Sequence, residues 1–246
     1  ASYDLKHERL LNKTIQEKKH EAIDAFYELL KIENVNRIDL FDNSHTFGSQ
    51  MISVMVVYKD FKPSKKDYRK YILKHTHKAD DLGAFKEVIY RRYQRALVEK
   101  SELPDLIIVD GGETQVNASK EVLKSLNIDI PLIGLKKDKF HTVHSIIYKE
   151  SSFKLDRRST LFSLLSTMIE ETHRFAITYH RNKRSKDLTK SILDEIKGVG
   201  EVRKRKLFKQ FSSLENMING SVEDYKEINI GESLRLEIIN TLKEKL

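Results

Sequence analysis

The sequence of 246 residues contains no cysteine, no long apolar run and no glycine-rich nucleotide-binding loop. Without cysteine, disulfide bonds and thiolate zinc sites are excluded, and a reducing compartment suits the chain. No apolar run approaches the roughly 20 residues that cross a membrane, and Ala1–Leu10 has no signal-peptide core. We therefore expect a soluble cytoplasmic protein with no membrane partner.

Basic residues outnumber acidic ones, 45 Lys and Arg against 37 Asp and Glu, which gives a formal net charge of +8. This excess favours a polyanionic partner, with nucleic acid first and an anionic membrane second. The length leaves room for one full α/β domain and a smaller second domain.

The spacing of apolar residues predicts a mixed α/β sheet with helices packed on it. The predicted helices are 5–31, one opened by Asp80-Asp81, Gln115–Leu126 and Thr160–His180. The predicted strands are Arg37–Asp42, Met51–Tyr58, Tyr68–Lys74, Leu106–Asp110, Pro131–Leu135, and a hairpin of Ser145–Tyr148 with Phe153–Leu155. The first three strands read as an antiparallel meander.

The composition changes after His180. The polar, basic segment Arg181–Lys190 has no apolar face, so we interpret it as a linker between domains 1–186 and 187–246. Beyond it the pattern is helical, and two similar units contain Gly198-Val199-Gly200 and Asn229-Ile230-Gly231. The second domain is therefore predicted to be an internally repeated, all-α unit.

Two predicted strands each end in a lone carboxylate, Asp42 and Asp110. The carboxyl ends of strands are where α/β proteins build their sites, so the two side chains could share one hard metal ion. The alternative is that each aspartate only caps the turn that follows it.

The third candidate ligand is His173, which helical spacing places on the sheet-facing side with Ile169 and Ile177. It could be a metal ligand, a general base for an attacking water, or a core histidine satisfied by a backbone carbonyl. His180, on the same predicted helix, is a weaker candidate for the third ligand. Two carboxylates suit Mg²⁺, and an imidazole ligand tilts the preference toward Mn²⁺.

The tail carries a candidate DNA-binding turn. Gly198, Val199 and Gly200 join two predicted helices, and Arg203 and Lys204 follow them. Glycines let backbone N–H groups at a helix start approach a phosphate, and basic side chains add contacts that do not depend on sequence. The second unit repeats the turn at Gly231. The alternative is a purely structural helical hairpin.

From Asn12 to the end, the chain resembles the carboxyl-terminal half of the UvrC family, the incising subunit of bacterial nucleotide excision repair. The matching motifs are Phe41-Asp42-Asn43-Ser44-His45, Asp80-Asp81, Arg91-Arg92-Tyr93, Pro104–Gly112, Ile133-Gly134-Leu135, His173–Arg181 and Ser191–Leu207. The resemblance implies an RNase H-like endonuclease domain that cuts 5′ to a lesion, followed by a tandem helix-hairpin-helix domain that binds DNA.

The same resemblance assigns roles to residues. Asp42, Asp110 and His173 match the family's metal-binding catalytic triad, and Asp81 matches a further catalytic carboxylate. Mg²⁺ or Mn²⁺ is the implied cofactor, with no other small molecule. The implied partners are damaged double-stranded DNA and, in the full-length protein, UvrB with UvrA upstream.

Two positions depart from the family pattern. Glu113 stands beside Asp110 where a lysine is usual, and Asn229 stands where the second hairpin usually has glycine. The 246 residues show no counterpart of the family's second nuclease or UvrB-binding segment, so we expect this chain alone to lack the 3′ cut and that docking contact. The alternative function is a nucleic-acid-binding module of the same fold that does not cut. A small-molecule phosphotransferase fits less well, because the nucleotide loop is missing.

Overall fold

A computed structural model describes the backbone of residues 2–44, 51–73 and 81–245, and side chains within these ranges except at 2–12, 44, 81 and 182–186. The chain divides into two compact units, Ala1–Ala176 and Ile177–Leu246. Among the described helices, none combines the length and hydropathy needed to cross a membrane.

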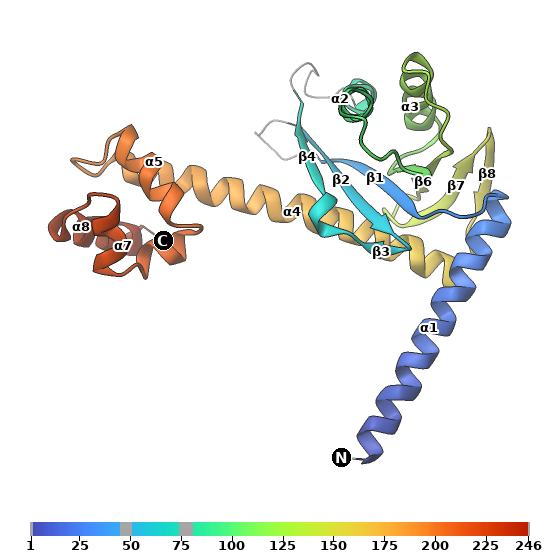
Figure 1. The fold of residues 1–246 in the computed structure, drawn as a ribbon, viewed down its shortest axis with the longest axis horizontal. Helices are drawn as coiled ribbons and strands as arrows, with labels where there is room; N and C mark the ends of the chain where they lie inside the picture. The colour runs from blue at the N-terminus through green and yellow to red at the C-terminus, as the bar shows by residue number, and fades with distance from the viewer. Residues whose placement is uncertain (1, 45–50, 74–80, 246) are drawn as a thin grey trace. The chain divides into compact units, whose positions relative to one another are not determined.

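The first unit is a mixed α/β structure (Figure 1). Its elements, in chain order, are α1 (Ser2–Leu30), β1 (Arg37–Ser44), β2 (Ile52–Lys59), β3 (Lys62–Pro63), the 3-10 helix η1 (Lys65–Asp67), β4 (Arg69–Ile72), α2 (Asp81–Glu99), β5 (Leu106–Val109), α3 (Glu113–Ser125), β6 (Leu132–Lys137), β7 (Val143–Tyr148), β8 (Ser151–Lys154) and the first part of α4 (Thr160–Asp194). The predicted α/β class and the order of strands and helices are confirmed.

The strands form one sheet in the order β3-β2-β1-β5-β6-β7-β8, with β4 paired to β2. The central strands β1, β5 and β6 run parallel, and the flanking pairs are antiparallel. Figure 1 shows α2 and α3 on one face of this sheet and α4 on the other. Covering both faces explains why the four residues of β5 are all apolar and all buried.

Alternation along β1 assigns its side chains to the two faces. Phe41 faces α2, where its ring lies 6.2 Å from that of Tyr93. Asp42, the next residue, therefore faces α4, where its carboxylate meets His173. A one-residue shift in this strand would exchange these two side chains, so the register of β1 decides where the carboxylate points.

Gly134 lets α3 pack closely on β6. A Cβ at this position would lie 2.5 Å from a Val116 side-chain carbon and 2.6 Å from the carbonyl oxygen of Gly111. No side chain fits there, so the glycine sets the approach of α3 and of the turn that follows Asp110.

The second unit is helical, as predicted. It contains the end of α4, α5 (Glu201–Gln210), α6 (Leu214–Ile218), α7 (Val222–Glu227) and α8 (Glu232–Glu244). Its core includes Tyr225, which is fully buried and donates a hydrogen bond of 2.6 Å to the carbonyl oxygen of Met217.

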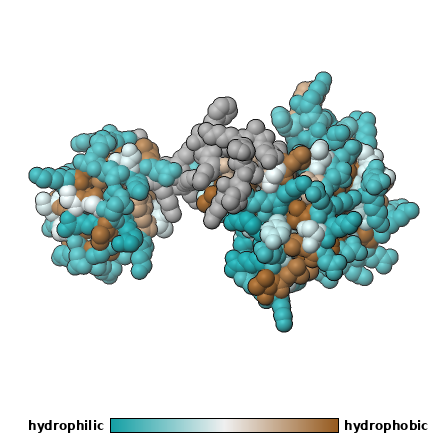
Figure 2. Space-filling model, turned by 90° about the horizontal axis from the view of Figure 1, so that it is seen from above, coloured by the Kyte–Doolittle hydropathy of each residue, from teal (hydrophilic) through white to brown (hydrophobic). Residues whose placement is uncertain are grey.

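On the face of the molecule in Figure 2, hydrophilic residues predominate and hydrophobic ones form small separate patches.

The predicted internal repeat is visible in the backbone of its two turns. Gly198 adopts a φ of +92°, and Asn229 adopts a φ of +61° at the equivalent place. The residues that follow them, Val199 and Ile230, are both buried. Since asparagine tolerates the left-handed region better than most residues, the missing glycine does not change the turn.

The predicted end of a helix at His180 is wrong, because the segment Arg181–Lys190, interpreted as a linker, is helical. Helix α4 runs unbroken through it from Thr160 to Asp194. The segment lacks an apolar face, but it also lacks the glycine and proline that would end a helix, and Lys and Arg are good helix formers. The assignment of 187–246 as a separate domain stays a prediction.

A buried ionic cluster lies between β1 and α2. The Asp39 carboxylate is fully buried and accepts a hydrogen bond of 2.9 Å from the Nε of Arg37. The Nε of Arg92 lies 3.5 Å from its other oxygen, and the Tyr93 hydroxyl donates to that oxygen at 3.4 Å. Burial raises the pKa of Asp39, while the two guanidinium groups act in the opposite direction.

We expect Asp39→Ala to lower the free energy of unfolding by about 3–5 kcal/mol, because it leaves two buried guanidinium groups without their shared carboxylate. Urea denaturation measures this change. Glu17→Gln is the matched control, since it breaks an exposed ion pair with Lys13 and should change stability little. Equal effects of the two variants would contradict a structural role for the buried cluster.

Candidate metal-binding active site

The parallel pairing of β1 with β5 brings two carboxylates to one edge of the sheet. Phe41 is in register with Val109, and the backbone N–H of Asp110 donates a 2.9 Å hydrogen bond to the carbonyl oxygen of Phe41. Asp42 and Asp110 are therefore neighbours on adjacent strands, and alternation directs both toward the α4 face. Both side chains are largely buried, with exposures of 9% and 4%.

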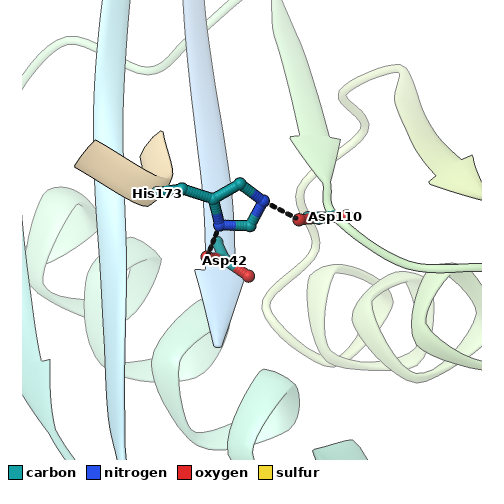
Figure 3. Close-up of side chains that lie close together, drawn as sticks. All are labelled: Asp42, Asp110 and His173. Carbon is teal, nitrogen blue, oxygen red and sulfur yellow. Dashed lines mark ion pairs between the residues drawn. The ribbon is translucent and has the colours of Figure 1, made fainter. Parts of the chain in front are cut away.

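Helix α4 adds His173 between the two aspartates (Figure 3). Its Nδ1 lies 3.1 Å from Asp42 Oδ2, and its Nε2 lies 3.5 Å from Asp110 Oδ2. The preceding residue, Thr172, is fully buried, and its hydroxyl donates to the carbonyl oxygen of Met168. Thr172 therefore lies on the buried side of α4, and the half-buried His173 follows it at the edge of the site.

The three side chains suit a divalent cation. One ligand atom from each of Asp42, Asp110 and His173 lies within 4.8 Å of the others, a separation that one ion can bridge. Two carboxylate oxygens and an imidazole nitrogen form a hard donor set with one borderline member. This part of the site therefore fits a metal centre.

Lys137 is a fourth member of the site. Its Nζ lies 2.6 Å from Asp110 Oδ2 and 3.0 Å from His173 Nε2. The sequence analysis did not include this lysine among the candidate site residues. Lys137 is the last residue of β6, two residues beyond the end predicted for that strand, and β6 lies parallel to β5, which Asp110 follows directly.

The charges at the site shift two pKa values. Burial, followed by the charge of Asp42, raises the pKa of Asp110, and the Lys137 ammonium opposes this change. The hydrogen bond to Asp42 raises the pKa of His173, while burial and Lys137 act in the opposite direction. Two adjacent carboxylates thus need positive charge nearby in order to ionise together.

The side chains next to His173 along α4 are fixed by pairing. Glu171 accepts a 3.0 Å hydrogen bond from the Tyr68 hydroxyl and a bidentate pair from Arg174, at 2.6 and 2.7 Å. The ring of Phe175 packs edge-on against Tyr68 at 5.0 Å. These contacts tie α4 to Tyr68, which lies between η1 and β4, so His173 is presented by a restrained helix.

Two predicted acidic residues are not placed at the site. Asp81 is the first residue of α2, but its side chain lies outside the described residues, as does Asp80 altogether. The unusual Glu113 is exposed at the first residue of α3, where a helix start favours a carboxylate.

The predicted DNA-binding residues lie in the second unit. Gly200 and Gly231 are the N-caps of α5 and α8, and a Cβ on either would meet no atom within 4 Å. Arg203 is exposed, and its Nη1 donates to the carbonyl oxygen of Gly198 at 2.6 Å.

Lys204 has a different environment from Arg203. Its side chain is 5% exposed, and its ammonium pairs with Asp194 and, at 2.7 Å, with Glu201. The lysine therefore holds α5 against the end of α4, and this pairing leaves it less able than Arg203 to reach a phosphate.

The fold and the site together define an RNase H-like domain with a candidate metal centre at the carboxyl ends of its parallel strands. Residues 27–177 match the family described as the UvrC RNase H endonuclease domain, and this chain belongs to that family.

Two curated relatives extend the match beyond the domain. The UvrABC system protein C of Streptococcus uberis is 42% identical over 238 residues, which cover 96% of this chain and 40% of that protein. The protein of the same name from Caldicellulosiruptor saccharolyticus is 43% identical over 227 residues, covering 92% and 38%. The chain thus spans about 40% of the length of the curated relatives it matches.

The solved structures to which this chain is partly similar include the catalytic domain of human Endonuclease V. The similarity covers 62% of this chain and 85% of that chain, at 12% identity and a TM-score of 0.33. The family membership rests on the sequence matches alone.

We expect Asp110→Asn to weaken Mn²⁺ binding about tenfold or more, because it removes an anionic ligand from the three-residue centre. Isothermal titration of the purified chain with MnCl₂ measures the affinity. Asp60→Asn is the control, since it removes an exposed carboxylate after β2, at the opposite end of the β1–β2 pair. Equal Mn²⁺ affinity of the two variants would exclude Asp110 as a ligand.

Proposed function

We propose that this chain is a metal-dependent DNA endonuclease that makes the 5′ incision beside a lesion in bacterial nucleotide excision repair. The observation that carries the proposal is the convergence of Asp42, Asp110 and His173 within 4.8 Å in a member of the UvrC endonuclease domain family. The relatives' name, UvrABC system protein C, supports the assignment to that repair system.

Mg²⁺ or Mn²⁺ is the proposed cofactor, held by Asp42, Asp110 and His173. When bound, such an ion supplies Lewis-acid charge that offsets the negative charge gained by a phosphodiester during hydrolysis. The two carboxylates favour either ion, and the imidazole favours Mn²⁺.

Asp42 orients His173 as well as offering a ligand oxygen. When the proton is on Nδ1, this N–H donates to Asp42, 3.1 Å away, and leaves the lone pair of Nε2 directed at Asp110 and Lys137. Nε2 is then the atom that either binds the cation or takes a proton from the attacking water. Both roles need the same tautomer, so both depend on the contact with Asp42.

Lys137 is proposed to act on the phosphate. Its ammonium bonds to Asp110 and His173, so a cation bound by these residues displaces it from them. The substrate brings anionic phosphate oxygens to the same place, and an ammonium group there stabilises the charge of the transition state. The lysine therefore competes with the cation for Asp110 but assists the reaction.

The second unit is proposed to hold DNA through its two repeated turns. Gly200 and Gly231 leave open space at the starts of α5 and α8, so backbone N–H groups there can approach phosphates without hindrance. The exposed Arg203 adds positive charge beside the first turn. We propose that these two turns, including Gly198 and Val199 of the first, bind the DNA phosphate backbone independently of base sequence.

The proposed partners are damaged double-stranded DNA and, for the full-length protein, UvrB with UvrA acting upstream. Asp81 is proposed as a further catalytic carboxylate, on the family resemblance alone. The alternative is a module of this fold that binds nucleic acid without cutting it. Substitution of Asp42 separates the two functions, since it lowers a nicking rate only if the chain cuts DNA.

We expect Asp42→Asn, introduced into the full-length protein, to lower nicking of damaged duplex, pre-assembled with UvrA and UvrB in Mn²⁺, by at least about 100-fold while DNA affinity stays within a few-fold. The variant loses one ligand and the orienting partner of His173. Denaturing gels give the rate and the position of the cut, and gel shifts give the affinity. Asp60→Asn should nick normally. An Asp42→Asn protein that nicks at the unmodified rate would contradict the proposal.

We expect Lys137→Met to bind Mn²⁺ more tightly yet nick about 10- to 100-fold more slowly. The substitution keeps the length of the side chain but removes the charge that competes for Asp110 and assists the phosphate. Titration calorimetry and the nicking assay measure the two effects. A purely structural role would lower both quantities together, so parallel losses would exclude the proposed role.

A further inference from the structure

The hairpin that joins β6 to β7 lies at the same edge of the sheet as the metal-binding site. Lys137 ends β6 and contacts Asp110, and the chain then turns through Asp138–Thr142 before β7 begins. Phe140 is three residues after Lys137, so its Cα is within about 10 Å of that of the lysine. The tip of this hairpin is therefore next to the proposed site of cleavage.

Asp138 fixes the shape of the tip. Its Oδ1 accepts hydrogen bonds from the backbone N–H groups of Phe140, at 2.8 Å, and Thr142, at 3.1 Å. Its other oxygen accepts from Arg157, and its backbone closes the turn with His141 and Thr142. Because these bonds order the loop in advance, binding to it costs little further conformational entropy.

The fixed tip presents an aromatic ring to solvent. Phe140 is 69% exposed, which makes it the most exposed aromatic residue among the described side chains. The Nζ of Lys139 lies 5.1 Å from its ring centroid, and His141 follows it. An ordered loop that exposes an aromatic ring between basic residues has the features of a surface on which a base can stack.

A basic groove of about 490 Å³ lies beside the ring. Its basic lining residues are Lys139, His144, Lys154, Arg157 and Arg158. Two aspartates, Asp138 and Asp156, also line it, so the four Lys and Arg side chains outnumber the carboxylates. The groove thus keeps an excess of positive charge, which suits a phosphate backbone.

We infer that Phe140 stacks on an unpaired base of the DNA strand while the adjoining groove holds the phosphates of that strand. The inference deepens the proposed function, on which it rests, by naming the form of DNA that the site takes: a duplex with at least one unstacked base near the cut. A fully paired duplex hides the faces of its bases, so it gives the ring no partner.

The test uses the chain's lack of tryptophan. Phe140→Trp introduces a single indole, and Val98→Trp is the matched control, on a residue 77% exposed near the end of α2 that leads into β5. Each variant is titrated in EDTA with a duplex containing a short unpaired bubble and with a fully paired duplex of equal length. We expect the bubble to quench the indole at position 140 and neither duplex to quench the one at position 98.

A second variant tests affinity. Phe140→Ala should bind the bubble duplex about 5- to 100-fold more weakly and the paired duplex within about twofold of the unsubstituted chain. Phe140 is exposed, so the substitution should leave the thermal unfolding midpoint unchanged. Full affinity of Phe140→Ala for the bubble, or equal quenching by both duplexes, overturns the inference.

These titrations contain no metal, so they are independent of the test of cleavage. A chain that shows the stacking signal but never nicks would overturn the proposed endonuclease activity and support base stacking. A chain that nicks normally but gives no signal at position 140 would overturn the stacking inference alone.

Discussion

The parallel register of β1 and β5 is the constraint on which the site depends. It pairs Phe41 with Val109, so the next residue on each strand is an aspartate, and both point to the same face. The apolar residues of these strands are buried between helices on both faces, and a shift of one residue would exchange the side chains of the two faces. The packing of the core and the position of the two carboxylates are thus set by one choice of register.

This register places the two negative carboxylates side by side on largely buried side chains. Nearby positive charge is therefore needed to offset their repulsion. Two unit charges 4 Å apart repel by about 4 kcal/mol at an effective dielectric constant near 20. In the chain itself the compensation comes from Lys137, 2.6 Å from Asp110, and from the hydrogen bond between His173 and Asp42. Since a divalent cation offers more charge than either, the same crowding that raises the pKa of Asp110 favours cation binding.

Those parts of the structure that depend on local pattern could be predicted from the sequence. The strands that end in Asp42 and Asp110 follow from apolar runs, and the sheet-facing position of His173 follows from helical spacing. Lys137 could not be found in this way, because its contact with Asp110 depends on which strand lies beside β5. The continuation of α4 beyond His180 was not predicted, since a polar helix carries no periodic signal of apolar residues.

The two departures from the family pattern have different physical meanings. Asn229 repeats the left-handed backbone of Gly198, and Gly231 keeps the open helix start that follows it, so the second turn is preserved by conformation although its residue differs. Glu113 instead adds a charge three residues after Asp110, at the first residue of α3. A carboxylate there is stabilised by the helix dipole, so it suits the start of the helix although the family usually has a lysine at this position.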